Sequence, residues 1–88
     1  MTTPQALVPD DIAQALLRFI NAEIMAPGAA ISAGDPFDRA GVDSLALLRV
    51  LVFIEATYGL WVPDEDLSEA NVGSVDSLAR YVAAHRAV

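Results

Sequence analysis

The sequence predicts an all-α fold: a small helical bundle of three main helices plus one short helix, with a long loop between the first two main helices. Three observations predict it. Apolar residues recur at helical spacing near both ends of the chain, and a central stretch is apolar on nearly every side. Helix start and stop residues frame these stretches. No stretch alternates between apolar and polar residues as a half-buried β-strand would.

The first helix is expected to begin at Pro9. A proline in the first turn and the acids Asp10 and Asp11 at the positive end of the helix dipole are start signals. Pro27-Gly28 ends the helix. Large apolar residues mark the face that it should bury: Ile12, Leu16, Phe19, Ile20 and Ile24.

Residues 26–43 are expected to form a long loop without a regular element, because they hold two Pro, three Gly and three Asp. Ile31 and Phe37 are its large apolar anchors before Val42. Loops of this length in small domains tend to be functional or held in place by side chains.

The second helix is expected from Ser44 to Tyr58, with Asp43 as its N-cap and Gly59 as its stop. Its apolar residues occupy most of its circumference. Such a helix either lies centrally in a bundle or presents a face to another molecule.

A short acidic turn or helix is expected at about 64–69, and Ser74 is expected to cap the final helix. The final helix has core spacing at Val75, Leu78, Tyr81 and Val82. The predicted core contacts between helices involve Phe19, Val50, Ile54 and Val82.

Composition excludes several functions. The 88 residues suffice for one domain, 1–88, with an ordered core of about 8–86. Twelve acids against five arginines give a net charge of −7, which argues against nucleic acids and anionic membrane surfaces. The apolar run at 45–54 is too short to span a membrane, and no signal peptide is recognisable, so we expect a cytoplasmic protein. Without cysteine and with one histidine, His85, we expect no metal site and no catalytic residue.

Ser44 in the pentapeptide GVDSL, residues 41–45, permits two interpretations. It is an ordinary first-turn residue after the cap Asp43, or it is an exposed hydroxyl that carries a phosphodiester. Free N–H groups and the helix dipole favour an anion there, and Gly41 permits a sharp turn. Asp43 could support the phosphate through a bridging metal ion.

The order of motifs decides between these interpretations. GVDSL follows a long loop and begins a helix ending in IEATYG; VPDEDL and SVDSLARYV follow. This order resembles the acyl carrier protein family over nearly the whole chain. The resemblance implies that Ser44 is the attachment site of 4′-phosphopantetheine, taken from coenzyme A by a transferase, and that the long loop is the connection typical of carrier proteins. The thiol of that arm would hold an acyl or aminoacyl group as a thioester.

The second helix also departs from the family pattern. Many fatty-acid carriers have acids on its exposed part, where this chain has Ala46 and Arg49. Arg49 is either a solvated side chain that reaches an acid in the loop or part of a changed partner surface. We expect partner contacts at Leu45, Leu48, Arg49 and Val52. Trp61 either covers a core edge or belongs to an exposed docking patch.

The sequence therefore predicts a carrier that is not an enzyme and is a monomer. Its expected partners are a phosphopantetheinyl transferase, an acyl- or aminoacyl-loading ligase and a downstream transferase or synthase. A specialised fatty-acyl or polyketide-like pathway and an amino-acid-loading, nonribosomal pathway both remain open. A different class also remains open: an unmodified helical interaction module that docks through its apolar second helix.

Overall fold

A computed structural model describes residues 8–85. In these residues the chain forms five α-helices and one 3₁₀ turn, and no β-strand: α1 (Pro9–Glu23), α2 (Phe37–Ala40), α3 (Ser44–Tyr58), η1 (Asp64–Asp66), α4 (Glu69–Val72) and α5 (Val75–His85). The prediction of an all-α fold with three main helices, α1, α3 and α5, is confirmed. The described residues contain three short helical segments, α2, η1 and α4, where one was expected. Residue 86, at the end of the expected ordered core, lies outside the described residues.

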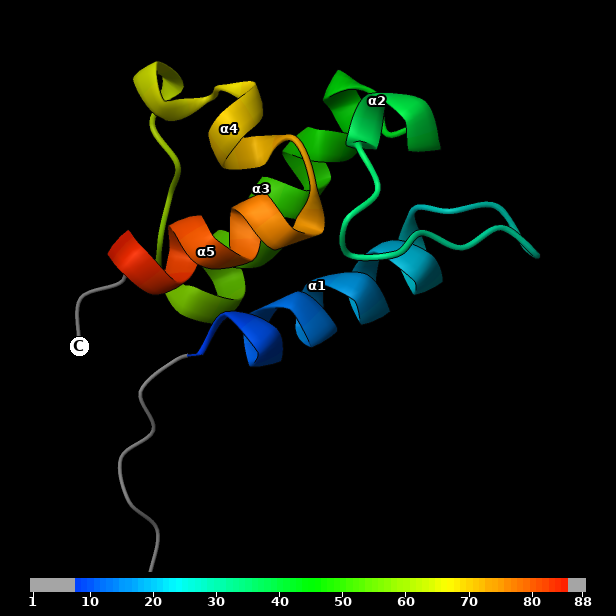
Figure 1. The fold of residues 1–88 in the computed structure, drawn as a ribbon, viewed down its shortest axis with the longest axis horizontal. Coiled ribbons are helices and arrows are strands. Elements are labelled where there is room, and N and C mark those ends of the chain that lie inside the picture. The colour runs from blue at the N-terminus through cyan, green and yellow to red at the C-terminus, as the bar shows by residue number, and fades with distance from the viewer. Residues whose placement is uncertain (1–7, 86–88) are drawn as a thin grey trace, which may run out of the picture.

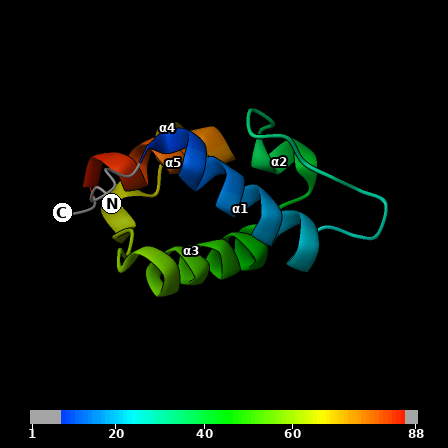
Figure 2. The same ribbon diagram turned by 90° about the horizontal axis from the view of Figure 1, so that it is seen from below.

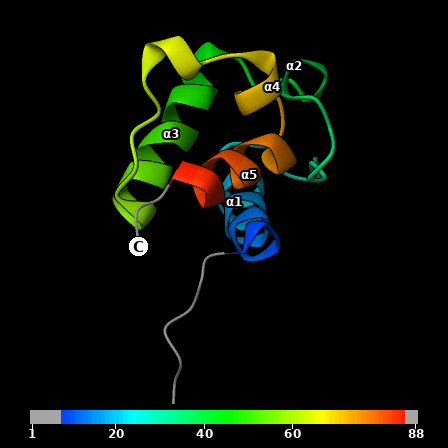
Figure 3. The same ribbon diagram turned by 60° about the vertical axis from the view of Figure 1, so that its left-hand side comes forward.

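The long helices surround one apolar core. α1 packs mainly against α5 and also contacts α3, as Figures 1 and 2 illustrate. The short helices α2 and α4 lie near the beginning of α3 in Figure 1, and Figure 3 shows the same arrangement from the side. Residues far apart in the sequence therefore meet where α3 begins.

The core is built from all three long helices. Its fully buried side chains include Ile12, Leu16 and Ile20 of α1, Val50 and Ile54 of α3, and Val75, Leu78 and Val82 of α5. The predicted burial of Val50, Ile54 and Val82 is confirmed. Among the described residues, the buried set contains no polar or charged residue, so apolar burial is its main source of stability.

The predicted burial of Phe19 is wrong in degree. Phe19 is half-buried at the edge of the α1 stripe, where its ring stacks on Phe53 of α3 with centroids 4.4 Å apart. Ile24 is also half-buried, because α1 ends one residue earlier. Both side chains lie at the margin of the core.

The expectation of an entirely irregular loop at 26–43 is also wrong, because the loop contains the one-turn helix α2. Pro36 provides its extended N-cap, and Gly41 closes it with a left-handed φ of 84°. The buried ring of Phe37 anchors α2, and the Phe37 N–H donates to the Gly73 carbonyl at 2.8 Å. The expected acidic segment at 64–69 is likewise divided: Leu67, with ψ 75°, separates η1 from α4.

Hydrogen bonds to its backbone hold the long loop against α1 and α5. The Asn21 side chain accepts from the Ile31 N–H at 2.9 Å and donates to the Ile31 carbonyl at 3.3 Å. The Asp76 N–H donates to the Ala33 carbonyl at 2.9 Å. These contacts fix the path of the loop toward Ser44, consistent with the expectation that such a loop is held by side chains.

A tyrosine ties η1 to α5. The buried Tyr81 donates its hydroxyl hydrogen to Asp66 Oδ2 at 2.6 Å. Burial and this hydrogen bond to a carboxylate raise the pKa of Tyr81 from 10.0 to about 12, because both disfavour the phenolate.

This pKa makes stability depend on alkaline pH. The folded protein retains the Tyr81 proton where the unfolded chain loses it, so the contribution is complete below pH 10 and is lost as pH rises toward 12. We expect Tyr81→Phe to lower the free energy of unfolding near neutral pH by about 1 kcal/mol or more. The difference between the two proteins should shrink from pH 10 upward. Urea denaturation from pH 7 to 11.5 measures this, and a constant difference would contradict the assignment.

Candidate functional site

Ser44 is exposed and is the first residue of the 15-residue helix α3. Asp43 is its N-cap: its Oδ1 accepts from the Ala46 N–H at 2.9 Å. The preceding Val42 is buried, and its N–H donates to the Phe37 carbonyl at 2.9 Å. A fixed backbone therefore presents the Ser44 hydroxyl to solvent, and the expected cap is confirmed.

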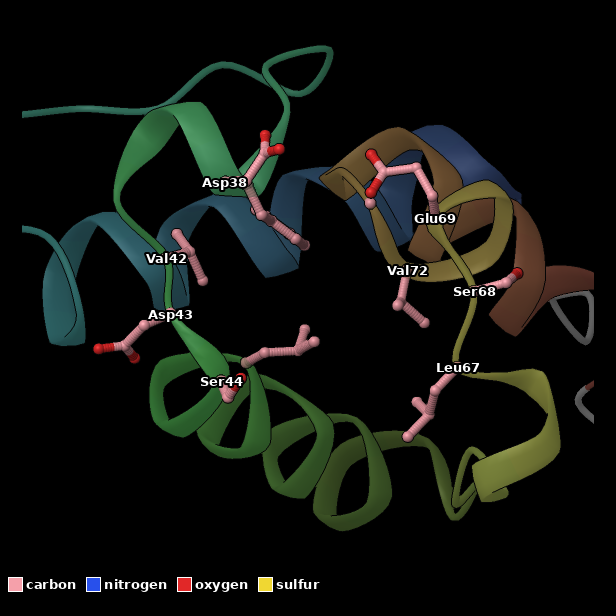
Figure 4. A pocket seen from close by; sticks show the side chains of 11 residues that line it. Asp38, Val42, Asp43, Ser44, Leu67, Ser68, Glu69 and Val72 are labelled. Carbon is pink, nitrogen blue, oxygen red and sulfur yellow. The ribbon is translucent and has the colours of Figure 1, made fainter.

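The start of α3 favours an anion at Ser44, although the adjacent Asp43 carboxylate is itself negative. The N–H groups of Ser44 and Leu45 have no carbonyl four residues earlier within the helix to bond. The first turn of α3 contains no acid, and Asp43 already uses Oδ1 for the cap. In Figure 4 the Asp43 carboxylate points away from the neighbouring pocket. A phosphate on Ser44 would meet the positive end of the helix dipole.

A pocket of about 260 Å³ adjoins Ser44 between α2, α3 and α4. Figure 4 shows Leu67 and Val72 facing the beginning of α3, with the carboxylates of Asp38 and Glu69 on the opposite rim. The sequence analysis did not identify this pocket, because Phe37, Leu67 and Val72 come from three separate short segments. The available signal was a few single large apolar residues within otherwise polar stretches.

The tetrapeptide VDSL occurs twice, at 42–45 and at 75–78, and the structure separates the two serines. Ser44 is the first residue of its helix, whereas Ser77 is the third residue of α5 and is half-buried. The Ser77 N–H donates to Ser74 Oγ at 3.2 Å, and Ser74 Oγ donates to Ser77 Oγ at 3.1 Å. Ser74 is therefore the cap that the sequence predicts, and Ser77 is engaged with it.

Two other serines differ from Ser44 in their setting. Ser68 is exposed and lines the same pocket, but it precedes the four-residue helix α4, whose dipole is small. Ser32 lies in the long loop, where its N–H donates to Asp35 Oδ2 at 2.9 Å. Of the described serines, Ser44 alone combines exposure with the start of a long helix.

The expected partner residues lie on the exposed side of α3. The exposed fractions are 70% for Leu45, 46% for Leu48 and 49% for Val52. Arg49 is also exposed, but it does not reach an acid in the loop: Nη1 donates to the main-chain carbonyl of Glu23 at 3.1 Å. This contact places a cation on the last residue of α1, where the helix dipole is negative.

Trp61 and His85 also have defined positions. Trp61 is 47% exposed, so the docking-patch alternative remains. His85 is exposed, but its ring stacks on Tyr81 with centroids 3.9 Å apart. Its Nδ1 lies 2.9 Å from the Tyr81 carbonyl oxygen. These contacts make it a structural residue of the α5 end.

Over the described residues, no group of three or more His, Cys, Asp or Glu side chains is placed to hold a metal ion. No helix within residues 8–85 is long and apolar enough to cross a membrane.

A helical bundle that presents a serine hydroxyl at the start of a long helix, after a long ordered loop, is the architecture of a carrier domain. The family profile described as "phosphopantetheine attachment site" matches residues 14–82. The chain therefore belongs to this family of carrier proteins, which is non-catalytic and bears 4′-phosphopantetheine on a serine. A search of curated proteins gives no match. The exposed hydroxyl and the anion-favouring helix start of Ser44 fit a covalently attached phosphate.

The Asp43→Ala variant tests how the cap of α3 affects stability and modification. Loss of the bond to the Ala46 N–H should lower the free energy of unfolding by about 1 kcal/mol. Phosphopantetheinylation should also slow, because the first turn of α3 frays more often. Asp43→Asn retains an acceptor for the cap and should keep most of the stability. Urea denaturation and the initial rate of modification check both effects, and an unchanged Asp43→Ala protein would contradict them.

Proposed function

We propose that the chain is a carrier protein in which Ser44 bears the phosphopantetheine arm. The arm holds an acyl or aminoacyl intermediate for a specialised fatty-acyl, polyketide-like or nonribosomal pathway. The observation that carries this proposal is the exposure of the Ser44 hydroxyl at the first position of α3. The proposal includes one carrier domain over 1–88, a monomeric state and the cytoplasmic location that the sequence predicts.

The chemistry of attachment requires little from this chain. Ser44 Oγ forms a bond to the phosphorus next to the pantetheine of coenzyme A, and the bond from that phosphorus to the bridging oxygen breaks. Adenosine 3′,5′-bisphosphate leaves, and the serine proton passes to a base on the transferase. The Asp43 cap keeps α3 helical as far as Ser44, so the transferase binds a hydroxyl that is held in a fixed position.

Bound phosphopantetheine supplies a flexible arm and a thiol that forms thioesters. Ser44 tethers the arm, so the cargo stays at high local concentration when a partner docks on the same domain. The domain contributes the docking surface and the anchoring point. Leu45, Leu48, Arg49 and Val52 are the proposed partner contacts, because all four are exposed and within three turns of the attachment point.

Intact-mass spectrometry tests the proposal. The protein is incubated with coenzyme A, magnesium and a promiscuous phosphopantetheinyl transferase. We expect complete conversion to a species heavier by one phosphopantetheine group. No mass gain, under conditions that convert a control carrier protein, would favour the alternative of an unmodified interaction module.

A further inference from the structure

Two hollows lie along α1 and α3, and the stacked rings of Phe19 and Phe53 line both of them. The first hollow, of about 340 Å³, is the more apolar of the two, and Leu48 and Val52 form part of its wall. Arg49 borders the first hollow and Arg18 borders the second. We call the two hollows together the α1/α3 groove; Glu23 of α1 and Ala56 of α3 also line it. It shares no lining residue with the pocket beside Ser44.

The groove exposes apolar surface along a helical line. Leu48, Val52 and Ala56 are spaced by four residues on α3, so they follow one another along about 12 Å of one helix face. Leu48 and Val52 are each about half exposed. Two helices that enclose an apolar hollow with such a line of side chains suit a third helix that presents its own apolar ridge.

The charge around the groove is opposite to that of the molecule. The chain has 12 acids and five arginines, yet two of the four described arginines border the groove. The one acid that lines it, Glu23, holds Arg49 in place through its main-chain carbonyl. Because that contact orients the guanidinium, its remaining N–H donors are available to a carboxylate at a low entropic cost.

We propose that the α1/α3 groove docks an amphipathic helix of a partner enzyme, in which acidic side chains flank an apolar ridge. Arg18 and Arg49 then receive the carboxylates while the ridge covers Phe19, Leu48, Val52 and Phe53. The groove begins one helical turn after Ser44, so a helix seated there holds the partner next to the arm. The identification of the partner as an enzyme rests on the proposed carrier function; the chemistry of the groove does not.

Two synthetic peptides test this proposal on the full-length protein. Both have the same leucine ridge at i, i+3, i+4 and i+7; glutamates flank it in one peptide and lysines in the other. The net charge of −7 attracts the lysine peptide at long range, so a preference for the glutamate peptide must arise locally. Fluorescence anisotropy should show tighter binding of the glutamate peptide by about fivefold at low salt, and less at high salt. Amide chemical-shift changes should centre on Phe19, Leu48 and Val52.

Single variants test how much each of the two arginines contributes to binding of the glutamate peptide. Arg18→Ala and Arg49→Ala should each weaken the glutamate peptide by about two- to fivefold. Arg80→Ala is the matched control, because it removes the same charge from an exposed position on α5. Arg49→Lys should restore part of the loss. Arg18→Ala remains informative if Arg49→Ala disturbs α1, since the Arg18 side chain has no hydrogen bond or ion pair to another described residue.

Several results would overturn the proposal. They are equal or tighter binding of the lysine peptide, no binding of either peptide, and an Arg80→Ala effect as large as that of Arg49→Ala. Concentration-dependent self-association that buries the groove would assign it to a second copy instead. Ser44→Ala should bind the glutamate peptide as the wild type does, so failure of the groove and failure of modification at Ser44 are observed separately.

Discussion

The Ser44→Ala variant is expected to fold normally and to gain no phosphopantetheine under conditions that convert the wild type completely. The Ser44 side chain is exposed and Asp43 supplies the cap, so an alanine at the first position of α3 removes no packing or cap contact. Alanine is also the best helix former. The loss should therefore be one of chemistry alone, with a circular dichroism spectrum and melting temperature close to those of the wild type.

Ser77→Ala and Ser68→Ala are the matched controls for this variant. Ser77 stands in the second VDSL sequence, and Ser68 lines the pocket beside Ser44. Both variants should be modified to the same extent as the wild type. Modification that persists in Ser44→Ala, or that is lost in either control while the protein remains folded, would place the arm on another residue.

The largest expected effect on stability is that of Ile54→Ala. Ile54 of α3 is fully buried, so its truncation removes apolar contacts and leaves a cavity between the helices. Comparable substitutions cost about 2–5 kcal/mol, which is a large part of the stability of a small domain. We expect a protein that is largely unfolded at 37 °C or melts far below the wild type in thermal denaturation.

Two further truncations provide reference values for the loss of stability expected in Ile54→Ala. Phe19→Ala should cost less than Ile54→Ala, because the Phe19 ring is half-buried and loses mainly its stacking on Phe53. Val52→Ala should change stability by about 0.5 kcal/mol or less, because Val52 is 49% exposed. A melting temperature of Ile54→Ala equal to that of Val52→Ala would show that the core is assigned to the wrong face of α3.

Local signals predicted the long helices well. The boundaries of α3 match the prediction because both ends carry strong local instructions: the Asp43 cap, and Gly59 with its left-handed φ of 71°. α1 likewise begins at Pro9, as expected. Where the residues that cap a helix lie within a few positions of its end, the sequence alone predicts the boundary of that helix.

The short helices depend on contacts between distant residues and were predicted only in part: η1 lies within the acidic turn or helix expected at about 64–69, but α2 was not expected. α2 is stabilised by the burial of Phe37 and by its N–H bond to Gly73, 36 positions along the chain. The pocket beside Ser44 arises from the same meeting of α2, α3 and α4. The position of the Arg49 side chain also depends on distant residues. Its exposure follows from α3 alone, but its hydrogen bond to the Glu23 carbonyl depends on how α1 and α3 pack.

The two VDSL sequences show what local sequence leaves out. Their four residues are identical, yet one serine begins a helix and the other lies at its third position beside Ser74. The difference depends on the residue that caps each helix, Asp43 in one case and Ser74 in the other. A motif indicates an attachment serine only together with the position at which its helix begins.

The most direct test of the account is the location of phosphopantetheine on the modified wild-type protein. Trypsin cleaves after Arg39 and Arg49 and releases residues 40–49, AGVDSLALLR, in which Ser44 is the only hydroxyl-bearing residue. Mass spectrometry of the digest should find one phosphopantetheine group on this peptide and none on any other. A group on the peptide 50–80, which holds Ser68, Ser74 and Ser77, or an unmodified peptide 40–49 from fully converted protein, would contradict the assignment of Ser44.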